Sequence, residues 1–144
     1  MSVLGIDLGA KRIGLAISDP SERVALPAGM IESRGRRADL AAITRLALER
    51  GVKQIVVGLP LHMDGRAGPE ALAARAFAKA LETESGIPVE TLDERWSSVA
   101  AERTLRETGQ SGRKRKPGAA DTLAATLLLR TFLERRANER GSKL

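Results

Sequence analysis

The chain has 144 residues, of which 42% are hydrophobic and 29% are charged, a balance typical of one globular domain and not of a disordered chain. It contains no cysteine and one histidine, which excludes disulfides, thiolate zinc sites, cysteine nucleophiles and histidine-rich metal centres. The net charge of +6 favours an anionic partner, nucleic acid first, and the aromatic content of 2% argues against binding by base stacking.

Targeting signals are absent from the sequence. No apolar run approaches the roughly 20 residues of a membrane span, and the first residues lack the pattern of a signal peptide. We therefore expect a cytoplasmic protein without a membrane partner. Any bound metal should be held by oxygen ligands, which favours Mg²⁺ or Mn²⁺.

The first part of the chain predicts strands. Residues 3–8 and 13–18 are apolar runs joined by a short turn that contains glycine, the pattern of a β-hairpin. Residues 24–31 fit a third strand, which Pro27 would place at a sheet edge or a bulge.

Beyond residue 31, helical and strand patterns alternate. Apolar spacing, glycine stops and proline positions predict helices over 39–50, 69–85, about 97–108 and 119–133, and strands over 54–59 and 88–92. A hairpin followed by β-α units predicts an α/β fold, with one mixed β-sheet that is antiparallel in its first strands, parallel afterwards, and flanked by helices. We expect a single domain over 1–138 and a charged tail over 139–144.

Three carboxylates occupy unusual places. Asp7 interrupts the apolar first strand, where it shares a face with Val3 and Gly5. Glu94 follows a short strand, and Asp121 lies in the first turn of the most apolar helix. Taken singly, each has an ordinary interpretation: a strand-end residue that caps a turn, a solvated loop residue with a local ion pair, and a residue that complements the helix dipole.

Taken together, the three carboxylates predict a site. Open α/β sheets place their sites at the carboxyl ends of strands, so the three side chains converge if their elements are neighbours. Such a cluster cannot stay fully ionised without cations. Two Mg²⁺ or Mn²⁺ ions would neutralise it and activate a water against a phosphodiester. Asp7, Glu94 and Asp121 are therefore the candidate metal ligands and catalytic residues.

Four blocks of sequence carry a family resemblance. They lie within residues 5–19, 57–65, 93–98 and 121–125 and include GIDLGAKRIG, VGLPLHMDG, DER and DTLAA. In this order they resemble the YqgF family, which comprises bacterial RNase H-like proteins related to the RuvC Holliday junction resolvases and described as nucleases that mature pre-16S ribosomal RNA. The resemblance implies an RNase H-like fold in which the three candidate carboxylates match the family's catalytic triad.

The chain departs from the related patterns at three positions. RuvC-type resolvases carry a fourth carboxylate one helical turn after the last Asp, where this chain has Ala124. His62 stands where the family usually has Asn, and Trp96 stands where the family is commonly aliphatic. We expect Trp96 to pack, and we place His62, Asp64 and Ser98 along the substrate groove.

The nucleic-acid-binding candidates are basic residues beside the carboxylates: Lys11, Arg12, Arg95, Arg113, Lys114, Arg115 and Lys116. The first two lie in the hairpin turn, where they are expected to contact phosphate. Arg95 either contacts phosphate or pairs with Asp93. The run over 113–116 is expected to clamp the substrate, and a solvated loop is the ordinary alternative.

The expected function is that of a divalent-metal-dependent nuclease that uses two ions. The resemblance favours RNA as the substrate, in 5′-end processing of pre-16S rRNA during ribosome biogenesis. Two alternatives remain open: a structure-selective DNA endonuclease such as a Holliday junction resolvase, and a nucleic-acid- or ribosome-binding factor without turnover. A monomer and a homodimer are both compatible with the sequence, although a resolvase needs paired active sites.

The basic surplus is confined to one end of the chain. Residues 1–108 contain 15 basic and 15 acidic side chains, whereas residues 109–144 contain 9 basic and 3 acidic ones. Nucleic-acid binding is therefore expected to depend on this end, and the run over 113–116 is its sharpest test.

Overall fold

The computed structural model describes residues 2–96 and 119–142, together with the side chains of all of these except residues 96, 119–121 and 141–142. The helix expected over 97–108, the groove candidate Ser98 and the cations over 113–116 lie outside the described residues, as does the side chain of Trp96.

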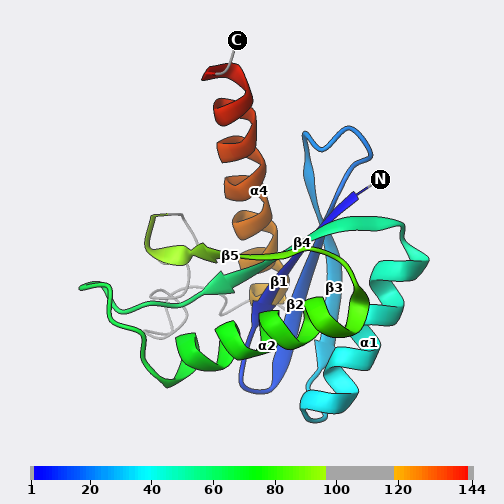
Figure 1. Ribbon diagram of the computed structural model, residues 1–144, viewed down its shortest axis with the longest axis vertical. Helices are drawn as coiled ribbons and strands as arrows, with labels where there is room; N and C mark the ends of the chain where they lie inside the picture. The colour runs from blue at the N-terminus through cyan, green and yellow to red at the C-terminus, as the bar shows by residue number, and fades with distance from the viewer. Residues whose placement is uncertain (1, 97–118, 143–144) are drawn as a thin grey trace.

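A five-stranded mixed sheet forms the centre of the molecule (Figure 1). Its strands, in the spatial order β3-β2-β1-β4-β5, are β3 (Ala25–Glu32), β2 (Arg12–Ser18), β1 (Ser2–Leu8), β4 (Val52–Leu59) and β5 (Val89–Asp93). The first three strands pair antiparallel, and β1, β4 and β5 run parallel. This is the mixed sheet that the sequence predicts. Pro27 indeed lies in an edge strand, next to an irregularity in the pairing with β2.

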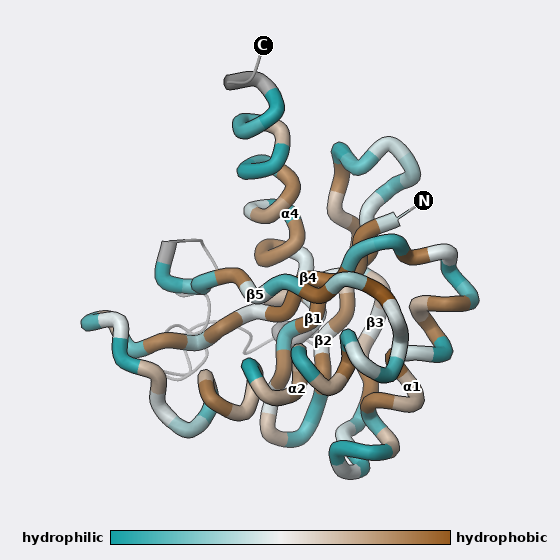
Figure 2. The backbone as a smooth tube through the Cα atoms, in the orientation of Figure 1, coloured by the Kyte–Doolittle hydropathy of each residue, from teal (hydrophilic) through white to brown (hydrophobic). Residues whose placement is uncertain are grey.

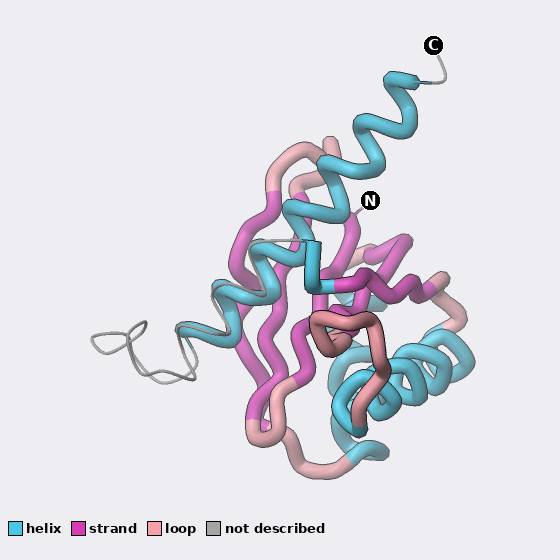
Figure 3. Tube along the Cα trace, turned by 90° about the vertical axis from the view of Figure 1, so that its left-hand side faces the viewer, coloured by secondary structure: helices cyan, strands magenta, loops and turns pink. Residues whose placement is uncertain are grey.

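Helices cover both faces of the sheet. Helices α1 (Arg36–Glu49) and α2 (Pro69–Ser85) lie side by side on one face, and α4 (Ala119–Ser142) crosses the other (Figures 1 and 3). A 3₁₀ turn, η1 (Glu94–Trp96), follows β5 directly. No helix in the described part of the chain combines the length and the apolar character that a membrane crossing requires.

Two helix boundaries differ from the sequence prediction. Helix α1 begins three residues earlier than expected, because the carboxylate of Asp39 is used inside the helix, where it accepts hydrogen bonds from the preceding loop. Helix α4 continues through Ser142, into the residues that we expected to form a tail. Its last turns are hydrophilic (Figure 2), but they consist largely of strong helix formers.

Alternation along the strands divides the core into two layers. Leu4 and Ile6 of β1 point toward α1 and α2, whereas Val3 points toward α4 and packs with Leu128 and Leu129. Gly5 lies on the α4 side, and a Cβ atom there would come within 2.9 Å of the Leu129 Cβ atom. The missing side chain at this position therefore lets α4 approach β1 closely.

A charged cluster at the end of the sheet opposite Asp7 ties three elements together. Glu22, in the turn between β2 and β3, accepts hydrogen bonds from Lys53 at 2.7 Å and from Arg136 of α4 at 3.2 Å. Its backbone has φ 59°, a conformation that non-glycine residues adopt only when the surroundings hold them there. The hydrogen bond from Lys53 is the main cause that lowers the pKa of Glu22.

We expect the Glu22→Gln variant to lose about 1 kcal/mol of unfolding free energy at neutral pH. The pKa of Glu22 is lower in the folded chain than in the unfolded chain, where it is about 4.3. The stabilisation is therefore complete above that value and is lost as the pH falls through the lowered folded-state pKa. Urea unfolding at a series of pH values should show the difference between variant and wild type shrinking in acid. Glu49→Gln, at an exposed glutamate of α1, serves as the control.

Candidate active site

Asp7 lies near the carboxyl end of β1, on the side of the sheet that α4 covers. Alternation places its side chain on the same face as Val3 and Gly5. It is 2% exposed, although it is a carboxylate. Its partner across the antiparallel pair is Gly14 of β2, which contributes no side chain beside it. A buried carboxylate in a core strand costs several kcal/mol unless other groups or cations compensate it, so its placement needs a functional reason.

Glu94 is buried as deeply as Asp7, with 3% of its surface exposed. It follows β5 immediately and opens η1. Its carboxyl group lies over Gly58 of β4, where a Cβ atom would overlap the Glu94 Oε1 atom and would lie 3.1 Å from Cδ. The solvated-loop interpretation of Glu94 is therefore wrong.

The sheet register brings Asp7 and Glu94 together. Strand β4 lies between β1 and β5, with Ile6 paired to Val57 and Gly58 paired to Leu92. The carboxyl group of Glu94 reaches back over Gly58, and neighbouring strands are about 4.8 Å apart. Both carboxylates therefore lie on the face that α4 covers, near the carboxyl ends of β1 and β5, which β4 separates.

The backbone of Asp121 lies in the first turn of α4, and its side chain is outside the described residues. The neighbouring Thr122 donates a hydrogen bond from Oγ1 to the Gly29 carbonyl at 3.2 Å. Gly29 has φ +90°, which favours glycine, and it lies at the irregular part of β3. This contact fixes the beginning of α4 against the sheet.

Arg95 is held by a neighbouring carboxylate. Its guanidinium group donates to both oxygens of Asp93, with distances down to 2.7 Å, and to the Met63 carbonyl at 3.3 Å. This pairing keeps the pKa of Asp93 below its usual value. Of the two interpretations of Arg95, the pair with Asp93 is present, and the hydrogen bond to the Met63 carbonyl joins η1 to the loop after β4.

The loop after β4 contains two of the groove candidates. The backbone of His62 exchanges hydrogen bonds with Arg66 and Gly65, and its ring lies against Gly68. Asp64 is exposed and pairs with Arg66 at 2.6 Å. Both residues follow the carboxyl end of β4, as Glu94 follows the carboxyl end of the parallel strand β5. A role in lining a substrate groove remains a prediction for them.

Lys11 and Arg12 lie in and just after the turn that joins β1 to β2, next to the end of β1 that carries Asp7. The turn is closed by a hydrogen bond from the Gly9 backbone N–H to the Arg12 carbonyl at 2.9 Å. Lys11 is exposed and Arg12 is half-buried. Contact with phosphate stays a prediction for both residues.

The donor set suits a hard divalent cation. Asp7 and Glu94 offer only carboxylate oxygens, in a setting shielded from water. Among the described side chains, no three histidine, cysteine, aspartate or glutamate residues come together closely enough to hold a metal. Asp121, the third candidate ligand, is not among those side chains.

Comparison with known proteins identifies the family. The family model described as RuvX, Holliday junction resolvase, matches residues 1–135. The chain belongs to the RuvX family. It is 48% identical over 137 residues to a protein of Anaeromyxobacter dehalogenans, with 95% of this chain and 99% of the relative covered, and 45% identical over 135 residues to one of Moorella thermoacetica, with 94% and 96% covered. Both relatives are named as candidate pre-16S rRNA nucleases.

Solved structures place this RuvX protein in the RNase H-like fold of the resolvases. Thermus thermophilus RuvC in complex with a Holliday junction superposes with a TM-score of 0.59 at 19% identity, covering 95% of this chain and 96% of that one. The fowlpox virus Holliday junction resolvase gives a TM-score of 0.54 at 15% identity, with 94% and 99% covered. The family and its relatives make this chain a hydrolytic nuclease that binds nucleic acid, and nucleases of the RuvC-like fold generally use divalent metal ions.

Gly58 is a site residue whose role sequence reasoning missed. It stands inside the block over 57–65, but its importance comes from the carboxyl group of Glu94 that lies over it, 36 residues later in the chain. The one signal in the sequence is a glycine within the apolar, buried second half of β4, which indicates close approach by another group.

Proposed function

We propose that Asp7, Glu94 and Asp121 hold two divalent cations, Mg²⁺ or Mn²⁺, and that this RuvX protein hydrolyses phosphodiester bonds of precursor 16S rRNA. The observation that carries the proposal is the burial of Asp7 and Glu94, at 2% and 3% exposure, on one face near the carboxyl ends of β1 and β5, with Gly58 of β4 between them. Two carboxylates buried on one face repel each other, and bound divalent cations would offset that repulsion.

Bound divalent cations supply a water of lowered pKa and neutralise charge on the phosphate and the leaving oxygen. The chain's own residues orient and shield this chemistry. Asp7 and Glu94 present oxygen ligands from rigid strand ends, and Gly58 keeps the space that the Glu94 carboxyl group occupies. Lys11 and Arg12 extend from the adjoining turn, where they can bind phosphates that flank the reacting one.

The substrate assignment rests on the relatives. Those at 45% and 48% identity carry the name of pre-16S rRNA nuclease, and each is matched over nearly its full length. The family description favours a second candidate, cleavage of four-way DNA junctions. A resolvase needs two active sites acting together, so that candidate requires a homodimer, whereas cleavage of an RNA end does not.

A cleavage panel tests the proposal. Purified protein is incubated with RNA that carries the 5′ flank of 16S rRNA, with a four-way DNA junction and with single-stranded DNA, each in Mg²⁺, in Mn²⁺ and in EDTA. We expect metal-dependent cleavage of the RNA flank, and oligomeric state is measured in parallel. Preferential cleavage of the junction by a dimer would favour the resolvase. Binding without cleavage under every condition would favour a factor without turnover and overturn the proposal.

A further inference from the structure

A second group of cations lies beside Lys11 and Arg12. The backbone N–H of Ser33 donates to the Lys11 carbonyl at 2.9 Å, so the loop between β3 and α1 lies against the β1–β2 turn (Figures 1 and 3). That loop and the first turn of α1 carry Arg34 and Arg37, both exposed. We call Lys11, Arg12, Arg34 and Arg37 the turn cluster.

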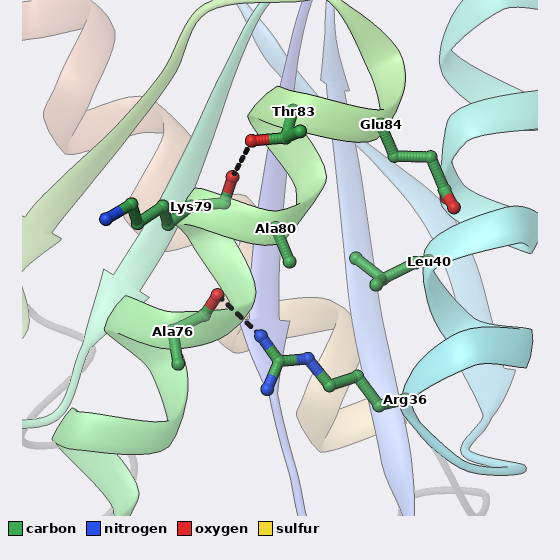
Figure 4. Close-up of a pocket in the computed structure, with 7 residues that line it drawn as sticks. All are labelled: Arg36, Leu40, Ala76, Lys79, Ala80, Thr83 and Glu84. Carbon is green, nitrogen blue, oxygen red and sulfur yellow. Dashed lines mark hydrogen bonds between the residues drawn. The ribbon is translucent and has the colours of Figure 1, made fainter.

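The side chains of the turn cluster form no ion pair with the part of the chain that the structure describes, residues 2–96 and 119–142. Arg36 differs from them, because its guanidinium group reaches across to α2 and donates to the Ala76 carbonyl at 2.9 Å (Figure 4). Arg36 therefore contributes to the contact between α1 and α2 and is left out of the turn cluster.

The loop that carries Arg34 is held in a defined shape. Asp39, which is 5% exposed, accepts hydrogen bonds from the Ser33 hydroxyl at 2.6 Å and from the Arg34 backbone N–H at 2.9 Å. Gly35 has φ +106°, a conformation that favours glycine, and its carbonyl accepts from the Asp39 backbone N–H. Because these contacts use backbone atoms and the Ser33 hydroxyl, the Arg34 side chain stays available for binding while its position is fixed.

We propose that the turn cluster is a binding surface for the phosphodiester backbone of nucleic acid, and that the substrate strand leaves Asp7 across the β1–β2 turn toward the beginning of α1. The proposal rests on the proposed nuclease function and adds Arg34 and Arg37 to the interface. Phosphate binding is the chemistry that fits, because neighbouring cations that form no ion pair among the described residues attract a polyanion, and a regular backbone offers evenly spaced charges. Within the β1–β2 turn, the end of β3 and the loop that follows β3, Glu32 is the only exposed acidic side chain. It lies opposite Arg12 across the sheet.

The test measures binding apart from cleavage. The fluorescence anisotropy of a labelled single-stranded RNA is recorded in EDTA over a range of salt concentrations for wild type and for the double variant Arg34→Gln/Arg37→Gln. Each phosphate contact contributes about 0.7 to the salt slope on a single strand, so the slope of the variant should fall by about 1.4. Its affinity at low salt should fall several-fold while its thermal midpoint stays unchanged.

A matched variant separates position from charge. Arg45→Gln/Arg50→Gln removes two exposed charges from the same helix and the residue after it, about 12 Å or more along the helix axis from Arg37. We expect this variant to keep the wild-type slope, and equal losses in the two double variants would overturn the proposal. Glu94→Gln should bind RNA normally yet fail to cleave it. A failure of the nuclease proposal is thus seen in cleavage alone, and a failure of the turn cluster is seen in binding alone.

Discussion

The Asp7→Asn variant is expected to lose cleavage activity by about 10³-fold or more while it stays folded. Loss of a metal-binding carboxylate removes several kcal/mol of charge stabilisation from the transition state, and each 1.36 kcal/mol changes the rate tenfold. Asparagine has nearly the same shape as aspartate, so the packing around a residue that is 2% exposed should persist. Single-turnover rates on the RNA substrate, measured in Mg²⁺ and in Mn²⁺, give the loss directly.

Thermal unfolding distinguishes a catalytic role of Asp7 from a structural one. A ligand that binds only the folded state raises stability, so divalent metal should raise the melting temperature of wild type and should do so much less in the variant. Without metal, the melting temperature of the variant should stay close to that of wild type, because asparagine keeps the shape of the buried side chain. The exposed Glu90 provides a control, since Glu90→Gln removes a carboxylate from β5 without touching the site. A variant that cleaves at the wild-type rate would exclude Asp7 from the metal site.

Replacing Gly58 by alanine is expected to reduce cleavage by about 10²-fold with little change in stability. The φ angle of Gly58 is accessible to any residue, so the strand itself tolerates alanine. The new Cβ atom would overlap the Glu94 Oε1 atom and would lie 3.2 Å from a methyl group of Leu128, so the Glu94 carboxyl group must move. A displacement of about 1 Å in a catalytic group can cost 10²-fold in rate. Cleavage rates measured on one preparation check the expected loss of activity, and urea unfolding of the same preparation checks the expected stability.

A double-mutant cycle tests whether Gly58 acts through Glu94. If the only effect of the alanine is to displace this carboxyl group, Gly58→Ala should cost little in a Glu94→Gln background. Losses that add in full would indicate that the alanine disturbs some other part of the site. Gly58→Ala should leave RNA affinity in EDTA unchanged, which separates it from variants of the turn cluster.

Local patterns in the sequence predict much of the fold. The two apolar runs around a glycine-containing turn predict the hairpin of β1 and β2, and Pro27 predicts the edge position of β3. Helix α2 begins and ends where Pro69 and Gly86 indicate. These signals are reliable because they act within a few residues: proline restricts its own backbone, and Gly86 has the positive φ that a helix end favours.

Part of the candidate site could be predicted from the sequence because one of its carboxylates breaks an apolar pattern. Asp7 interrupts an apolar strand, and a charge in such a strand requires a function or a compensating partner. Glu94 gave no comparable signal, because a glutamate between a strand and a turn is usually solvated. Its burial depends on Gly58 of another strand, which leaves room for its carboxyl group. Arg34 and Arg37 were likewise overlooked, because a short basic run before a helix is common on protein surfaces.

By itself, the sequence determined the order and type of the strands and longer helices that the structure describes, the three candidate carboxylates, and through its four blocks the family. Only the tertiary structure decided which residues far apart in the sequence lie close together in space. Parallel pairing of β1, β4 and β5 places Asp7 and Glu94 on one face, and the contact between Ser33 and Lys11 joins Arg34 and Arg37 to the β1–β2 turn. The type of each element follows from interactions within a few residues. Contacts between residues far apart in the chain depend instead on strand register and on close packing between segments.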